Sequence, residues 1–184
     1  MKEYSFSFEI FLGYHCCGRG EYVSGEGYVI LEDEQVDRLV SFVRANGGET
    51  DIEKLGLATK CPDIYEALED AYMEAVGKAT YRYWLIKGFE EGYYEEPEGM
   101  MKSLEEDGLF QYEPDHTNLE AVDGELEAEK EDAFYDWLKT YFDSLDEDGQ
   151  VSFIETCYGE VLSLDGPGDY DYTVEIPQEI INLA

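Results

Sequence analysis

The stretch Tyr4–Tyr14, YSFSFEIFLGY, decides the fold of this chain. Its large apolar side chains occupy every second position and alternate at first with serines and a glutamate, a period typical of a strand with one buried face. A glycine-rich stretch at residues 18–27, GRGEYVSGEG, then leads into the apolar run Tyr28–Leu31. Such a run is a natural antiparallel partner, so we predict a β-hairpin.

Helical periodicity follows the hairpin. Residues 32–48 place apolar side chains three and four positions apart behind an acidic first turn, and two glycines end the pattern. The same spacing predicts a longer helix over about residues 63–87 and another over about residues 134–145. Residues 90–122 are rich in acids, glycines and prolines, which predicts a long acidic loop with one helical turn near residues 100–106.

Alternation returns near the end of the chain. Tyr170–Ile176, YDYTVEI, again places apolar side chains at every second position, which predicts a strand that pairs with the hairpin. The expected fold class is α+β, with an antiparallel sheet from the N-terminal hairpin and the C-terminal strand, covered by about three helices. At 184 residues, the chain is expected to form a single domain over residues 1–184.

The charge of the chain is large and unevenly distributed. It contains 45 Asp and Glu against 12 Lys and Arg, a net charge of -33. Residues 1–89 hold 16 acids and 9 bases, whereas residues 90–184 hold 29 acids and only 3 bases. Such a field repels nucleic acids and anionic lipid surfaces, and it attracts basic proteins and divalent cations. We therefore expect no direct binding to nucleic acid or membrane.

The compartment is predicted from the N-terminus and the cysteines. Glu3 and Glu9 would interrupt the apolar core of a signal peptide, and no window approaches the roughly 18 apolar residues of a membrane span. These features predict a cytoplasmic protein. Its four cysteines are then expected to be reduced thiols, because disulfides are uncommon in the cytosol.

An acidic segment, Ser144–Glu155 (SLDEDGQVSFIE), resembles the calcium loop of the EF-hand. With Gly149 at the sixth position, where the loop turns sharply, oxygen-bearing side chains fall at positions three, five, nine and twelve. Two departures are a serine at position one and the lack of a second loop. The resemblance implies calcium as the candidate cofactor and a cation-binding module as the alternative function. The ligands it implies are Asp146, Asp148, Ser152 and Glu155.

Other motifs do not favour an enzyme. The adjacent Cys16 and Cys17 would point to opposite faces of a continuing strand, so buried thiols are favoured over a zinc site. The glycines of residues 18–27 lead into a strand and lack the spacing of a phosphate-binding loop. The aromatic stretch Tyr81–Tyr94 has few accompanying bases, which favours core packing or a protein contact over base stacking. An enzyme is therefore the less favoured class.

The acidity itself supports the leading hypothesis, an interaction protein that occupies a basic surface, as DNA-mimicking inhibitors do. Residues 90–148 hold 22 acids against 3 bases, and a face dense in carboxylates can compete with DNA for the same lysines and arginines. The competing interpretation is that these acids only keep a tyrosine-rich chain in solution. The predicted contact residues are Glu90, Glu91, Glu95, Glu96, Glu105, Glu106, Asp107, Glu125, Glu127, Glu129, Glu131 and Asp132.

Overall fold

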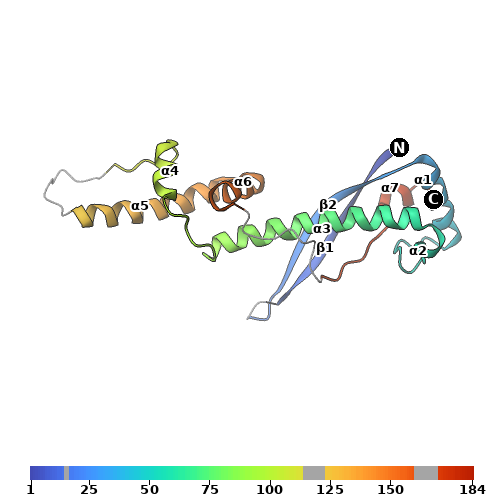
Figure 1. The fold of residues 1–184 in the computed structure, drawn as a ribbon. Coiled ribbons are helices and arrows are strands. Elements are labelled where there is room, and N and C mark those ends of the chain that lie inside the picture. The colour runs from blue at the N-terminus through green and yellow to red at the C-terminus, as the bar shows by residue number, and fades with distance from the viewer. Residues whose placement is uncertain (15–16, 114–122, 160–169) are drawn as a thin grey trace. The chain divides into compact units, whose positions relative to one another are not determined.

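The chain forms two compact units in a computed structural model. The first unit comprises Met1–Tyr83 and Leu164–Ala184, and the second comprises Trp84–Ser163. That residues 1–184 form a single domain stays a prediction. The described residues are 1–14, 17–113, 123–159 and 170–184, without the side chains of 123–125. Both chain ends lie in the first unit (Figure 1).

The first unit is built on the predicted hairpin. β1 (Lys2–Tyr14) and β2 (Gly20–Leu31) pair antiparallel, with Tyr4 opposite Val29. The alternating burial of β1 follows its alternating sequence, and Tyr4 and Ile10 lie in the core. The α+β class and the antiparallel hairpin are thus confirmed.

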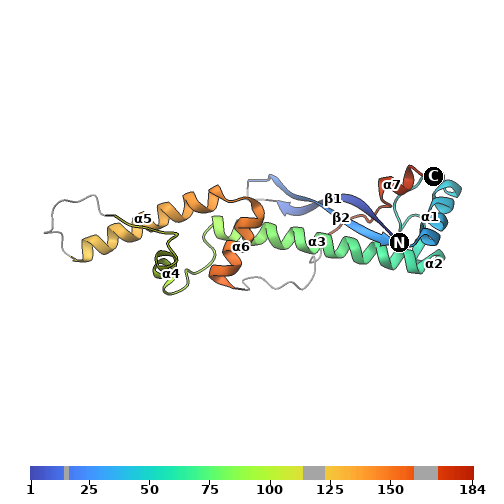
Figure 2. The same cartoon turned by 90° about the horizontal axis from the view of Figure 1, so that it is seen from above.

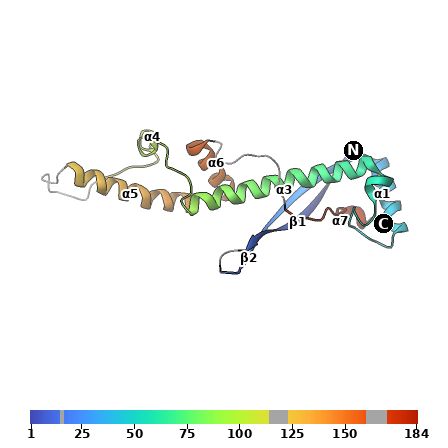
Figure 3. The same ribbon diagram turned by 60° about the horizontal axis from the view of Figure 1, so that its bottom comes forward.

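In the described ranges, four helices belong wholly or mainly to the first unit. They are α1 (Asp33–Ala45), α2 (Leu57–Lys60), α3 (Pro62–Glu90) and α7 (Gln178–Ile181). The last two turns of α3 lie in the second unit, because the boundary follows Tyr83. In Figures 1 and 3 the hairpin crosses α3 obliquely, and the core lies between these layers.

Two glycines of β2 allow the hairpin to approach α3. Gly27 faces Phe6 across the strands, and a Cβ built on Gly27 would lie 2.5 Å from Cζ of Phe6 and 2.8 Å from Cβ of Ala75. The Phe6 ring stacks on Tyr72 of α3 with centroids 3.9 Å apart. Gly25 faces Phe8 in the same way, with 2.4 Å between its built Cβ and Cζ of Phe8. Glycine here makes room for aromatic rings rather than for an unusual backbone.

The predicted C-terminal strand does not pair with the hairpin. In the described part of the chain the sheet has two strands, and Glu175 instead forms an isolated bridge with Asp51. The amide of Ile176 donates to the carbonyl of Thr50 over 2.9 Å. Ile176 is buried in the core and so anchors the segment away from β1. Pro177, which has no N–H, then leads directly into α7.

The second unit is helical in its described residues. It contains the end of α3, α4 (Met100–Glu106), α5 (Asp123–Ser144) and α6 (Glu147–Tyr158). The predicted turn near residues 100–106 is confirmed as α4 within the acidic loop region, of which residues 114–122 lie outside the described residues. Instead of about three helices, seven occur in the described ranges, with α6 the longest of those not predicted.

Aromatic side chains form the centre of this second unit. The ring of Phe89, at the end of α3, lies 4.1 Å from that of Phe142 and 6.0 Å from that of Tyr158. The hydroxyl of Tyr94 donates to the carbonyl of Leu85 over 2.9 Å. Part of the stretch Tyr81–Tyr94 thus packs into a core, as predicted.

None of the helices in the described ranges combines the length and the apolar character that a membrane crossing requires.

Candidate functional site: the acidic surface of the second unit

The segment that resembles a calcium loop is mostly helical. α6 begins at Glu147, and Asp146 is its N-cap, where one carboxylate oxygen accepts a hydrogen bond from the amide of Gly149 over 2.8 Å. Gly149 therefore lies in the first turn of a helix and not at the sharp turn of a loop. Asp146 is a favoured N-cap residue, and two acids in the first turn complement the helix dipole. Two of the acids expected to bind calcium, Asp146 and Asp148, thus stabilise a helix start.

The remaining predicted ligands are spread along α6. Asp148, Ser152 and Glu155 are exposed and follow one another at intervals of four and three residues. No group of three or more His, Cys, Asp or Glu side chains in the described ranges is arranged to hold a metal ion. A calcium loop would require the first turns of α6 to unwind.

The cysteines lie in different surroundings. Cys17 is exposed, Cys61 is buried in the core of the first unit, and Cys157 is half-buried on α6. Burial raises the pKa of the Cys157 thiol, which disfavours the reactive thiolate. The neighbouring Cys16, named with Cys17 as a weak zinc candidate, lies outside the described residues.

Negative charge is concentrated in the second unit. Its 80 residues carry 24 Asp and Glu against 4 Lys and Arg, a net charge of -20. The first unit carries 21 acids against 8 bases over 104 residues, a net charge of -13. The second unit therefore has about twice the charge per residue.

Helix α5 presents a row of carboxylates to solvent. Phe134, Leu138 and Phe142 are buried along one face, and side chains about half a turn away from them lie on the opposite, exposed face. The acids on that outer face follow one another at intervals of three, four and seven residues. They are Glu129, Asp132, Asp136 and Asp143, named here the α5 stripe. Lys139 is the base that interrupts it.

Several acids next to the α5 stripe are held in place by specific contacts. The ammonium of Lys130 lies 2.7 Å from a carboxylate oxygen of Glu105, which joins α5 to α4. The hydroxyl of Tyr135 donates to Glu96. Figures 1 and 2 show α4 alongside α5. These contacts hold the acids of α4 and of the preceding segment beside those of α5.

Two tyrosines on this surface, Tyr135 and Tyr112, have a raised pKa, to which nearby carboxylates contribute. The hydrogen bond to Glu96, with burial and the nearby carboxylates, raises the pKa of Tyr135 to about 12. The hydroxyl of Tyr112 donates to Glu129 over 3.4 Å, and burial together with Glu129 raises the pKa of Tyr112. Both phenols therefore stay protonated at neutral pH and act as donors that orient carboxylates.

The predicted contact residues are placed in three groups. Glu90 and Glu91 lie at or just after the C-terminus of α3, and Glu95 and Glu96 lie in the segment between α3 and α4. Glu105, Glu106 and Asp107 lie at the end of α4. Glu125, Glu127, Glu129, Glu131 and Asp132 lie on α5, where the side chain of Glu125 is outside the description.

Two members of the α5 stripe, Asp136 and Asp143, are not among the contact residues predicted from the sequence. The signal was present, because both lie on the polar side of the helical pattern predicted over residues 134–145. They become part of one row with Glu129 and Asp132 only when the helix begins at Asp123.

No protein family matches this sequence, and no curated protein or solved structure is significantly similar to it. Its function is therefore inferred from its own residues and geometry.

Proposed function

We propose that this protein is an interaction protein whose second unit occupies a basic surface of a nucleic-acid-binding partner, in the manner of a DNA mimic. The single observation that carries the proposal is the α5 stripe, a row of exposed carboxylates on a helix that is anchored from behind by its buried aromatic face. A rigid row of charges can compete for lysines and arginines without first losing side-chain and backbone freedom.

The amount of charge is of the right order. α5 has 22 residues, which at about 1.5 Å per residue is roughly 33 Å of helix. Duplex DNA of that length carries about 19 phosphates, and the whole second unit has a net charge of -20. The α5 stripe alone is too sparse, so the acids of α4 and of residues 90–98 are needed to approach the charge of a duplex.

We propose the cytoplasm as its compartment. Cys17, Cys61 and Cys157 are free thiols, and free thiols persist where the environment is reducing.

Competition with DNA tests the proposal. A labelled 20-base-pair duplex bound to a basic, sequence-nonspecific DNA-binding protein would be titrated with this protein, and the concentration that displaces half of the duplex would be measured. The test variant is the triple substitution Asp132→Lys, Asp136→Lys and Asp143→Lys, which reverses three exposed charges of the α5 stripe. At roughly 0.7 kcal/mol for each reversal, we expect about 30-fold weaker competition.

A matched control separates position from net charge. Reversing Glu34, Glu66 and Asp70 to Lys changes the net charge by the same amount on exposed positions of the first unit. We expect less than a threefold effect from this variant. Equal effects of the two variants, or no competition by the unmodified protein at about 100 mM salt, would contradict the proposal and favour the view that the acids serve solubility.

A further inference from the structure

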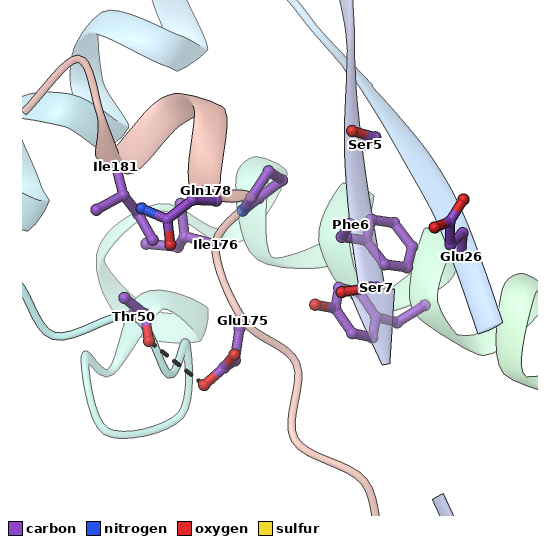
Figure 4. Close-up of a pocket in the computed structure, with 11 residues that line it drawn as sticks. Ser5, Phe6, Ser7, Glu26, Thr50, Glu175, Ile176, Gln178 and Ile181 are labelled. Carbon is purple, nitrogen blue, oxygen red and sulfur yellow. Dashed lines mark hydrogen bonds between the residues drawn. The ribbon is translucent and has the colours of Figure 1, made fainter. Parts of the chain in front are cut away.

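A cavity of about 370 Å³ lies in the first unit between β1 and the segment before α7 (Figure 4). Its volume falls in the range of small binding sites. The residues that line it come from the hairpin, from α3, from Thr50 and from the end of the chain. They are Ser5, Phe6, Ser7, Glu26, Thr50, Tyr72, Glu175, Ile176, Pro177, Gln178 and Ile181.

Two backbone edges face each other across this cavity. Ser5, Phe6 and Ser7 are consecutive in β1 and all line the cavity, although side chains of neighbouring strand residues point to opposite faces. Consecutive residues share a cavity when the edge of their strand faces it. The other edge of β1 pairs with β2, so the outer edge of β1 forms this wall.

The opposite wall is extended backbone as well. The amide of Ile176 donates to the carbonyl of Thr50, and the carbonyl of Val174 accepts from the amide of Ile52 over 3.2 Å. In an antiparallel bridge of this kind, the residue between those two directs its N–H and C=O to the other side. Glu175 is that residue, and it lines the cavity.

The floor of the cavity is aromatic with one polar group. The ring of Phe6 stacks on Tyr72. The N–H of Glu175 is directed at the oxygen of Tyr72, so the C=O of Glu175 is the backbone group that this wall offers to an occupant. Burial raises the pKa of Tyr72, so its hydroxyl keeps its proton and remains a donor at neutral pH.

The charged side chains that line the cavity are negative, while Lys2 and Lys54 lie farther out, near Glu179 and Glu175. Glu26 and Glu175 line it, and no Lys or Arg is among its lining residues. Glu179 lies beside it, where it accepts a hydrogen bond from the hydroxyl of Ser5 over 3.3 Å, but its charge is offset by the ammonium of Lys2 at 3.9 Å. An occupant with positive charge therefore complements this site.

We infer that this cavity is a docking slot for an extended, basic peptide segment, which enters as a strand between the edge of β1 and the segment Val174–Ile176. Strand addition to an exposed sheet edge obtains affinity from backbone hydrogen bonds and selectivity from side chains. Three lining residues of β1 span roughly 10 Å, which accommodates about three residues of the peptide. Its Lys or Arg side chains lie against Glu26 and Glu175.

This slot lies wholly in the first unit and is independent of the role proposed for the α5 stripe. The protein has no third strand in its sheet within the described ranges, and the inserted peptide takes the position that the sequence predicted for residues 170–176.

Peptide binding to the whole protein tests the inference. The probe is the acetylated and amidated peptide KVKVKVK, and its acidic counterpart is EVEVEVE. Two further versions of the basic peptide carry N-methyl groups on the valine amides or on the lysine amides, which blocks one edge of the peptide strand in each. We expect KVKVKVK to shift the amide NMR signals of residues 5–7 and 174–176, and EVEVEVE to leave them unchanged. At least one methylated version should bind tenfold or more weakly at these residues.

A charge reversal locates the contact. Glu175→Lys should weaken binding at residues 5–7 about tenfold, whereas Glu66→Lys, an exposed reversal elsewhere in the first unit, should change it less than twofold. Unchanged signals outside residues 172–178 would show that the Glu175→Lys protein is folded.

Three outcomes would overturn the inference. Equal binding of all methylated peptides would mean that charge alone attracts them. Displacement of KVKVKVK by an equal concentration of spermidine would make the site a pocket for small cations. NMR shifts confined to residues of the second unit would mean that the peptide does not occupy the slot. The α5 stripe variant should abolish such shifts. This outcome would therefore contradict the slot without contradicting the proposed function.

Discussion

The two units are both acidic but differ in their secondary structure, their core side chains and their net charge. The first unit places a mainly aliphatic core between a hairpin and helices and carries a net charge of -13. The second unit is smaller, is helical in its described residues and carries -20. Its largest buried side chains are phenylalanines, among them Phe110, Phe134 and Phe142.

Buried aromatic side chains suit a strongly charged unit. Self-repulsion opposes compaction, and a buried aromatic side chain removes roughly 150–250 Å² from water, more than an aliphatic residue does. The rings are also in mutual contact, with 5.1 Å between the centroids of Phe110 and Phe134 and 5.0 Å between those of Trp137 and Tyr141. The more strongly charged second unit thus buries phenylalanines beside its aliphatic side chains.

The largest expected effect comes from removing one core residue in each unit. Phe110→Ala should destabilise the second unit by about 3–5 kcal/mol, and Leu39→Ala should destabilise the first by about 2–5 kcal/mol. Both side chains are almost fully buried. Amide hydrogen exchange, read residue by residue, would show loss of protection confined to the unit that carries the substitution.

If either substitution caused loss of protection in both units, the two units would unfold as one and would not have separate stabilities. The exposed substitution Tyr93→Ala is the control, since 74% of this side chain is exposed and its removal should alter protection little in either unit.

A smaller effect is expected where the hairpin meets α3. Gly27→Ala should cost about 1–3 kcal/mol, because the new methyl group overlaps the ring of Phe6, which is stacked on Tyr72, and the methyl group of Ala75. Gly25→Ala meets only the ring of Phe8, which is half-buried and can move aside. Urea unfolding of the two variants would measure the difference.

We expect Gly25→Ala to be the milder of the two by about 1 kcal/mol or more. If Gly25→Ala were instead the more destabilising of the two, the contact between Gly27 and α3 would not be what limits how closely the hairpin packs on α3. Extra mobility of the glycines in the unfolded chain affects both variants alike and so cancels in the comparison.

The smallest effect is that of salt. Raising the ionic strength from 0.01 M to 0.15 M shortens the screening length from about 30 Å to about 8 Å. Relief of self-repulsion should stabilise the second unit more than the first, by a few tenths of a kcal/mol to about 1 kcal/mol. Hydrogen exchange at the two salt concentrations would measure both units in one sample.

The same measurement with divalent cations tests the calcium alternative. With α6 helical from Glu147, calcium and magnesium at matched ionic strength should stabilise the second unit equally. A shift specific to calcium, saturating near one equivalent and lost in Glu155→Gln, would revive the alternative and show that α6 unwinds.

Local sequence patterns predicted the individual strands and helices better than they predicted which segments pair or pack with one another. The hairpin and the helical spacing of α1, α3 and α5 could be read from the sequence because burial of one face repeats with a fixed period. α6 was not predicted, because Asp146, Asp148, Gly149 and Glu155 also satisfy the spacing of a calcium loop. The N-cap role of Asp146 is what distinguishes the two, and it becomes visible only with the backbone.

The candidate sites depended still more on tertiary structure. Most of the acidic contact residues of the second unit could be named from the sequence. That Asp136 and Asp143 share one helix face with Glu129 could not, because this depends on the full extent of α5. No sequence pattern indicates the slot beside β1, because its walls are backbone edges from opposite ends of the chain.

By itself, the sequence determined the α+β class, the hairpin, the acidity and its concentration toward the C-terminal half. These properties follow from composition and from periods of two and 3.6 residues, which act over a few neighbouring positions. Tertiary structure alone decided that residues 174–176 pair with Thr50–Ile52 and not with β1, and that the chain divides into two units. Alternation specifies which side chains are buried, but the partner of a strand is chosen by the core that its anchors, here Ile176 and Ile180, can reach.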